Sequence, residues 1–152
     1  AHQQGTMMTH PGRACCTLVV ALLAAQPFGS AAQRDEDRKP SVAFRATPPT
    51  GFSPLRVRVT VDLRGGADDY AEFYCPSIEW DWDDGTVSES SEDCSPYEAG
   101  TSRIQRRYTA EHVYRRNGSY RIYFRMKQKD RIVGAGNGNV QVRAGAGEGF
   151  DR

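Results

Sequence analysis

The chain has 152 residues, a formal net charge of +1 and a hydrophobic fraction of 38%. This length suits one domain with a buried core, and the composition excludes a wholly disordered chain. The nearly balanced charge argues against general nucleic-acid binding, so no nucleic-acid partner is expected. Acidic residues dominate residues 68–98 and basic residues dominate residues 103–131, which leaves local charge recognition open.

The N-terminal stretch is predicted to be a targeting segment rather than part of the fold. An arginine precedes an almost unbroken apolar run over residues 14–25, and small residues follow it. This is the pattern of a signal peptide, expected to start at Met7 or Met8 after an extension over residues 1–6 and to be cleaved after Ala32. If the segment is retained, it is instead a short membrane anchor, and the chain is an accessory subunit of a membrane complex.

Composition divides the rest of the chain into three parts. Residues 33–40 are charged and are expected to form a flexible lead-in. Residues 41–144 carry the strand patterns and form the domain. Residues 145–152 are a glycine-rich tail that is expected to be disordered.

The first strands of the domain are predicted from alternating polarity. Residues 42–47 indicate an edge strand, followed by two prolines and a turn at Thr50–Gly51. Residues 55–63 give the clearest strand: the odd positions are valine or leucine and face one side, whereas the even positions are polar and face the other.

A second strand group is centred on the two tryptophans. Residues 73–82 predict a strand that places Trp80 and Trp82 on its buried face, and because no other tryptophan exists they mark the centre of the core. Asp84-Gly85 predicts a tight hairpin turn, since aspartate tolerates positive φ and glycine has no Cβ to clash. Residues 87–89 are expected to pair briefly after that turn.

The remaining strands alternate less regularly. Residues 103–110 predict a weaker strand, because Arg106 interrupts its apolar side. After a turn at Asn117–Gly118, residues 120–126 predict a strong strand. The last strand, over residues 132–142, contains three glycines that indicate a bulge or kink at a sheet edge. Short strands with turns between them and no helical period predict an all-β sandwich.

Cys75 and Cys94 are predicted to form a disulfide. The other two cysteines lie in the predicted targeting segment, which leaves an even pair in an exported chain. Two cysteines are too few for a structural zinc site.

Three separated motifs resemble the PKD (polycystic kidney disease) domain family. They are Trp80-Asp81-Trp82-Asp83-Asp84-Gly85, His112-x-Tyr114 and Gly118-x-Tyr120-x-Ile122. The resemblance covers residues 40–144 and implies an immunoglobulin-like antiparallel β-sandwich of about seven strands, with a structural role for the histidine. Family members are usually extracellular binding modules, spacers or adhesion units rather than enzymes. This chain departs from the family at Trp82 and Asp83, where phenylalanine and glycine are usual.

The aspartates near the tryptophans suggest two kinds of site. General acid catalysis needs a carboxyl group with a raised pKa in a cleft, whereas Asp81, Asp83 and Asp84 are expected in water on an outer face and turn. No catalytic residue and no resident cofactor are therefore predicted. A calcium site is an alternative, because hard cations collect carboxylate oxygens; its ligands would be Asp68, Asp69, Asp83 and Asp84. The simpler expectation is that Asp84 accepts hydrogen bonds within its own turn.

Arginine and tyrosine alternate through the basic stretch and form a candidate ligand face. Its members are Arg115, Arg116, Arg121, Tyr123, Arg125 and Lys127. Such a face could hold an acidic polysaccharide or another polyanion. The competing interpretation pairs Arg121 and Arg125 with acidic residues of the tryptophan strand, but it accounts poorly for Arg115 and Arg116.

The expected function is an exported, non-catalytic interaction or structural module. Its partner would be a protein or a glycan outside the cytoplasm, or the chain would be an accessory subunit of an extracytoplasmic assembly. Polyanion binding through the arginine and tyrosine face is the alternative. A hydrolase is a second and weaker alternative, which a cleft holding a perturbed carboxylate would support.

Overall fold

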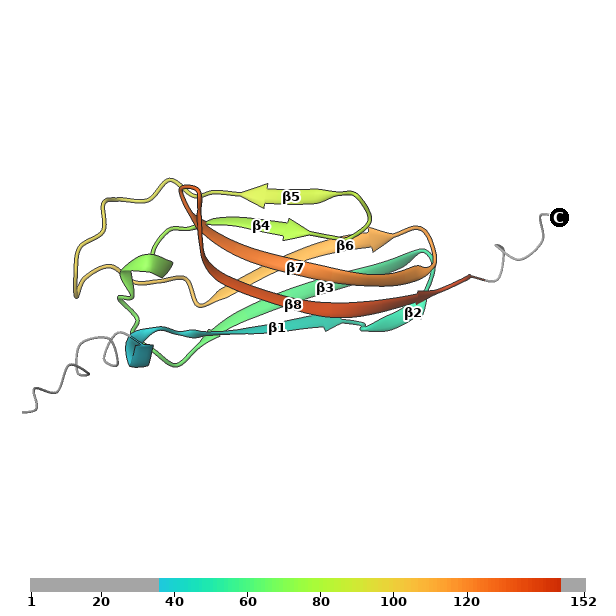
Figure 1. Cartoon of the computed structure of the whole chain (residues 1–152), viewed down its shortest axis with the longest axis horizontal. Coiled ribbons are helices and arrows are strands. Elements are labelled where there is room, and N and C mark those ends of the chain that lie inside the picture. The colour runs from blue at the N-terminus through green and yellow to red at the C-terminus, as the bar shows by residue number, and fades with distance from the viewer. Residues whose placement is uncertain (1–35, 146–152) are drawn as a thin grey trace, which may run out of the picture.

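The computed structural model describes residues 36–145, and within them two sheets pack face to face as a β-sandwich (Figure 1). The strands are β1 (Ser41–Thr47), β2 (Thr50–Phe52), β3 (Leu55–Arg64), β4 (Ser77–Asp81), β5 (Val87–Ser90), β6 (Arg107–Tyr114), β7 (Gly118–Gln128) and β8 (Arg131–Arg143), and a 3-10 helix, η1 (Ala71–Phe73), precedes β4. The predicted immunoglobulin-like sandwich is confirmed, with eight described strands rather than about seven.

The smaller sheet has the order β1-β3-β6 and the larger sheet the order β2-β8-β7-β4-β5. Neighbours are antiparallel except β2, which runs parallel to the end of β8. The predicted turn at Thr50–Gly51 is therefore wrong. The chain crosses there from one sheet to the other, and backbone hydrogen bonds from Gln141 N to Pro49 O (2.9 Å) and from Ser53 N to Arg143 O (2.9 Å) fix the new strand.

The core lies between the sheets and follows the predicted alternation. From β3, Val57, Val59 and Val61 are fully buried, and β7 contributes a second fully buried row that includes Phe124. Trp80 lies opposite Phe124 across the β4–β7 pair, with ring centroids 4.8 Å apart. The tryptophan prediction is confirmed, since both indoles are almost completely buried.

The segment around the tryptophans differs from the prediction at both ends. β4 begins at Ser77 rather than at residue 73, because the chain first makes the η1 turn that buries the Phe73 ring. The hairpin after β4 is also longer than a two-residue turn. Asp83 (φ 60°) and Gly85 (φ 87°) both take left-handed conformations, and Trp82 N donates to Thr86 O at 3.1 Å.

β6 begins at Arg107 and runs to Tyr114, so the predicted start at residue 103 is wrong. Arg106 turns away from the sheet and donates to Gly65 O at 2.6 Å and, through Nε, to Asp68 Oδ1 at 2.9 Å. The interruption seen in the sequence is thus the place where the strand starts.

β8 is continuous through its glycines. The register shifts between Met126 and Lys127, so the predicted bulge is present, beside Gly134. Gly138 is needed for another reason, because a Cβ there would come within 2.5 Å of the Phe44 ring on β1. Gly138 thus lets the two sheets approach closely. The predicted edge position holds only for the part of β8 that does not pair with β2.

The chain before β1 is held against the loop that follows β3. Residues 36–38 form a helical turn, Ala67 N donates to Arg38 O at 2.7 Å, and Pro40 is buried. Residues 36–40 of the predicted flexible lead-in thus contact the domain. The predicted signal peptide or anchor and the tail after residue 145 lie outside the described residues. Among residues 36–145, no helix has the length and apolar character to cross a membrane.

Candidate ligand-binding site

A row of stacked rings closes the end of the sandwich where β6 turns into β7, here called the hairpin end. The Trp82 and His112 rings lie parallel at 4.6 Å, Tyr114 meets His112 edge-on at 4.8 Å, and Tyr120 stacks on Tyr114 at 4.1 Å. The Tyr114 hydroxyl donates to Trp82 O at 3.0 Å. The three motifs that are separated in the sequence therefore meet in one cluster, and His112 has a structural position.

Asp84 fastens the β4–β5 loop to this cluster. Its carboxylate accepts hydrogen bonds from Thr86 Oγ1 (2.6 Å), Thr86 N (3.1 Å) and His112 Nε2 (2.6 Å). Because an ionised carboxylate only accepts, Nε2 of His112 carries the proton. Burial acts to raise the pKa of Asp84, but the hydrogen bonds from Thr86 and His112 outweigh it and hold the pKa below its ordinary value. The expected bond within the turn is confirmed, with His112 as a further partner.

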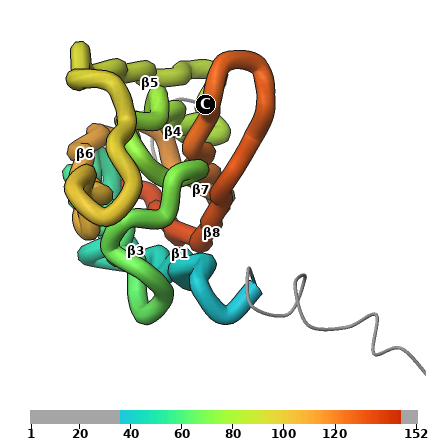
Figure 2. The backbone as a smooth tube through the Cα atoms, turned by 90° about the vertical axis from the view of Figure 1, so that its left-hand side faces the viewer, coloured from blue at the N-terminus to red at the C-terminus, as the bar shows by residue number. Residues whose placement is uncertain are grey.

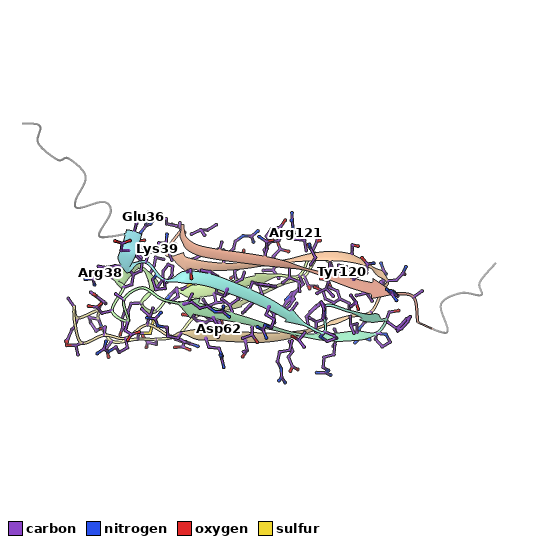
Figure 3. The ribbon with its side chains drawn as sticks, turned by 90° about the horizontal axis from the view of Figure 1, so that it is seen from below. Glu36, Arg38, Lys39, Asp62, Tyr120 and Arg121 are labelled. Atoms are coloured by element: carbon purple, nitrogen blue, oxygen red, sulfur yellow. A yellow bond between two sulfur atoms is a disulfide. The ribbon has the colours of Figure 1, made fainter. Side chains whose placement is uncertain are left out.

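Three predicted ligand-face residues remain unpaired at the hairpin end. Arg115 and Arg116 are exposed beyond the end of β6, and Arg121 is exposed on β7. Within residues 36–145, no carboxylate lies within ion-pair distance of these three guanidinium groups. Figure 3 shows Tyr120 and Arg121 in the half of the molecule away from Glu36 and Lys39.

Tyr120 separates two shallow hollows on this end. One is lined by His112, Arg115 and Arg116 together with Asp84, and the other by Arg121, Asp83 and residues of β8. The Tyr120 hydroxyl donates to Arg116 O at 3.0 Å, which fixes the hairpin backbone. Arg115, Arg116, Tyr120 and Arg121 are called the hairpin-end surface below.

The other half of the predicted ligand face is occupied by ion pairs. Glu79 contacts Arg125 (2.5 Å) and Lys127, and Arg125 also lies 3.5 Å from Asp81. Arg125 is placed over the Tyr123 ring at 5.3 Å. Hydrogen bonds from Lys127 and Arg125 lower the pKa of Glu79, so this carboxylate stays ionised. Cross-strand pairing therefore accounts for Arg125 and Lys127, whereas Arg121 offers only its backbone N–H to Asp83, at 2.8 Å.

The four aspartates of the predicted calcium site do not come together. Asp68 pairs with Arg106, and Asp69 pairs with Arg38 at 3.0 Å, both in the loop after β3. Asp83 and Asp84 lie in the β4–β5 loop at the hairpin end (Figure 1). No group of three or more His, Cys, Asp or Glu side chains in the described part of the chain could hold a metal ion. The predicted ligand set is not assembled.

The disulfide between Cys75 and Cys94 is confirmed and lies at the opposite end, here called the disulfide end. It closes a sequence separation of 19 residues, with a Cα–Cα distance of 6.2 Å. The Tyr97 hydroxyl donates to Asp69 O at 2.7 Å, and the Tyr74 hydroxyl to Ser95 O at 3.0 Å. The polar segment between β5 and β6 is thus tied to the body at several points.

Part of the hairpin-end surroundings is not predicted from the sequence. Tyr120 belongs to a predicted motif and opens the predicted strand over residues 120–126, but its place as a partly buried residue that lines both hollows is not predicted. Thr50 and Gln141 line the second hollow because β2 pairs with β8. Nothing local in the sequence indicates this pairing, since it joins segments at opposite ends of the domain.

Comparisons with known proteins give structural likeness only. No family model matches the chain, and no curated protein matches it. The PKD domain of an M14-like peptidase from Thermoplasmatales archaeon SCGC AB-540-F20 is similar with 12% identity and a TM-score of 0.46, covering 70% of this chain and 97% of that one. A superoxide reductase (neelaredoxin) from Archaeoglobus fulgidus has 12% identity and a TM-score of 0.44, with coverage of 70% and 91%. A superoxide reductase (neelaredoxin) from Ignicoccus hospitalis has 13% identity and a TM-score of 0.41, covering 71% of this chain and 84% of that one. None of these scores assigns a family or an activity.

Proposed function

We propose that this chain is an exported, non-catalytic interaction module of the PKD type, and that its hairpin-end surface binds an acidic polysaccharide. The observation that carries the proposal is the group of three arginines, Arg115, Arg116 and Arg121, gathered around one tyrosine without a carboxylate partner among the described residues. Arginine presents a planar set of donors that matches a carboxylate or sulfate group in two contacts at once.

The contrast with neighbouring arginines supports this choice. Arg56 and Arg58, from the same end of β3, both pair with Glu111, at 3.3 Å and 2.6 Å. The unpaired arginines therefore leave an excess of positive charge on the hairpin end, which would attract an anionic chain from solution. The ring of Tyr120 adds an apolar face of the kind that packs against sugar rings.

The ionisation of the carboxylates supports a non-catalytic role. A general acid needs a pKa raised towards neutrality, in a cleft. The carboxyl groups with a resolved shift all have lowered pKa values, because hydrogen-bonding partners, mostly cationic side chains, outweigh the effect of burial; they are Asp68, Glu72, Glu79, Asp84 and Glu111. Groups held in this way accept hydrogen bonds and stabilise the fold.

The disulfide supports export. Disulfides persist in oxidising compartments and are rare in the reducing cytosol. The predicted signal peptide also supports export. The proposed ligand, an acidic polysaccharide, is found outside cells.

The test is binding of alginate, a polymer of uronic acids, by the full chain in isothermal titration calorimetry. The variant Arg115→Gln/Arg116→Gln/Arg121→Gln is expected to bind about tenfold more weakly or worse, since two or more charge-assisted contacts are lost. Wild-type affinity should also fall steeply as salt rises, because exposed charges are screened.

The matched control removes the same charge elsewhere. Arg45, Arg64 and Lys129 are exposed and lie on other parts of the molecule, and the structure records no ion pair for them within residues 36–145. Their triple exchange to glutamine should keep nearly wild-type affinity. Equal losses in the two variants would show that only net charge matters, and salt-independent binding would contradict an electrostatic site; either result overturns the proposal.

A further inference from the structure

A separate cavity lies at the disulfide end, away from the two hollows of the hairpin-end surface. It has a volume of about 280 Å³ and opens between the two sheets, where β4 and β5 face the start of β6. Most of its lining is polar; Ile78, Trp80 and Tyr108 contribute apolar surface, and the Cys75–Cys94 disulfide lies on its wall. Figure 2 shows the segment between β5 and β6, in yellow, crossing from one sheet to the other at this end.

One residue of the cavity lining, Tyr108, has a buried polar atom with no partner. Tyr108 is 8% exposed, and of the buried side-chain polar atoms in residues 36–145 its hydroxyl alone makes no hydrogen bond. Burial, and then the negative charge of Glu92, raise the pKa of Tyr108 to about 12, so the hydroxyl keeps its proton at neutral pH. A buried donor without an acceptor lowers the stability of the fold. Folded proteins rarely contain one unless a water molecule, an ion or a ligand accepts the hydrogen bond.

The rim of the cavity is rich in further donors. Arg107 uses Nε to hold Asp62 at 2.6 Å, which leaves its other N–H groups available. Arg103 is 3.9 Å from Asp68, a distance too long for a hydrogen bond. Glu92 is the one carboxylate among the lining residues, so donors and positive charge prevail.

These features specify the chemistry of a ligand. The indole and isoleucine side chains favour contact with a flat ring, and a buried donor in a lining that also includes two arginines favours an anionic acceptor. The volume lies just below the range typical of drug-sized ligands, which restricts the occupant to a small molecule.

We propose that this cavity binds a small aromatic carboxylate, with its ring against Ile78 and Trp80 and a carboxylate oxygen accepting the Tyr108 hydroxyl. Arg103 and Arg107 attract the charge at the rim. Because the Tyr108 hydroxyl is shielded from bulk water, the ligand reaches it by displacing side chains of the exposed segment between β5 and β6, which supplies Glu92 and Arg103. This site is independent of the function proposed for the hairpin-end surface.

The test uses benzoate as the probe and the full chain with its disulfide intact. Titration followed by 1H–15N chemical shifts should show saturable shifts of the Trp80 indole and of residues around the cavity. Tyr108→Phe keeps the ring and removes only the donor, so benzoate should bind about tenfold more weakly. The same variant without ligand should melt at the same temperature as the wild type or higher, because an unsatisfied buried hydroxyl has been removed.

Two controls separate this site from other effects. Tyr123→Phe removes a hydroxyl on the outer face of β7 and should leave benzoate affinity unchanged. The Arg115→Gln/Arg116→Gln/Arg121→Gln variant should also bind benzoate as the wild type does. The proposal is overturned if wild-type protein shows no saturable binding, if Tyr108→Phe binds equally well, or if Tyr108→Phe melts at a lower temperature. A lower melting temperature would mean that the Tyr108 hydroxyl makes a stabilising hydrogen bond to a buried water molecule.

Discussion

The two ends of the sandwich are closed in different ways. At the hairpin end, short connections bring Trp82, His112 and Tyr114 together, and ring stacking with a few hydrogen bonds fills the space between the sheets. At the disulfide end, long connections over residues 65–76 and 91–106 must cross between elements, and a covalent bond holds them. One end is closed by packing and the other by a cross-link.

This difference decides where each end can bind a ligand. At the packed end, stacked rings lie between the sheets, and the proposed binding groups lie on the hairpin-end surface. The cross-linked end is less completely filled, so a cavity with an unpartnered Tyr108 hydroxyl remains inside it. A disulfide allows such space, because it stabilises a fold mainly by restricting the unfolded chain rather than by filling volume.

The largest expected effect is the loss of the indole at the packed end. Trp82→Ala should lower the free energy of unfolding by about 3–5 kcal/mol, because a fully buried aromatic ring leaves a cavity between Trp80 and His112. Urea unfolding measured by circular dichroism gives this value. Phe52→Ala, at a residue 62% exposed, is the control and should change it by less than about 0.5 kcal/mol. A similar small change in both variants would show that packing does not close this end.

The next effect concerns the cross-linked end. Cys75→Ala/Cys94→Ala should lower the free energy of unfolding by about 3 kcal/mol, the value expected for a closed loop of this length. The wild type in dithiothreitol should unfold like the double variant, and the double variant should not respond to the reductant. If the double variant is as stable as the oxidised wild type, hydrogen bonds such as that from Tyr97 to Asp69 hold this end without the cross-link.

The features that the sequence predicted are those encoded locally. Alternation in residues 55–63 defined β3, and the spacing of Trp80 and Trp82 placed both indoles in the core. The number of cysteines predicted the disulfide, because only Cys75 and Cys94 lie outside the predicted targeting segment. In each case a short stretch or a count contained the required information.

The features that were missed depend on partners far away in the chain. Arg121 and Arg125 are both predicted to pair with acidic residues of the tryptophan strand, yet Arg125 contacts Glu79 across the β4–β7 pair and Arg121 makes no ion pair within residues 36–145. Composition alone cannot separate the two. The parallel pairing of β2 with β8 was missed for the same reason, since it joins residues 50–52 to residues 141–143.

A smaller effect tests how the packed end depends on pH. Asp84→Asn should cost about 1–2 kcal/mol at neutral pH, because the charged acceptor for Thr86 and His112 is lost. The pKa of Asp84 is lowered on folding, so its contribution is complete above the ordinary aspartate value and is lost as pH falls through the lower folded value. The difference between variant and wild type should therefore shrink below about pH 4. Asp130→Asn, in the exposed β7–β8 turn, is the control and should change the free energy of unfolding at neutral pH by less than about 0.5 kcal/mol.

The smallest effect lies between the two ends, on the outer face of β4. Glu79→Gln removes a charge that contacts Arg125 and Lys127, and cross-strand pairs of this kind contribute about 0.2–1 kcal/mol each. Because the pairs are partly exposed, the difference in unfolding free energy should decrease in about 1 M NaCl, where screening is strong. Glu89→Gln is the matched control, since Glu89 is more exposed and lies 3.8 Å from Lys127, and it should change stability less. A Glu79→Gln cost that is large and insensitive to salt would mean that this charged face, rather than either closed end, holds the sheet together.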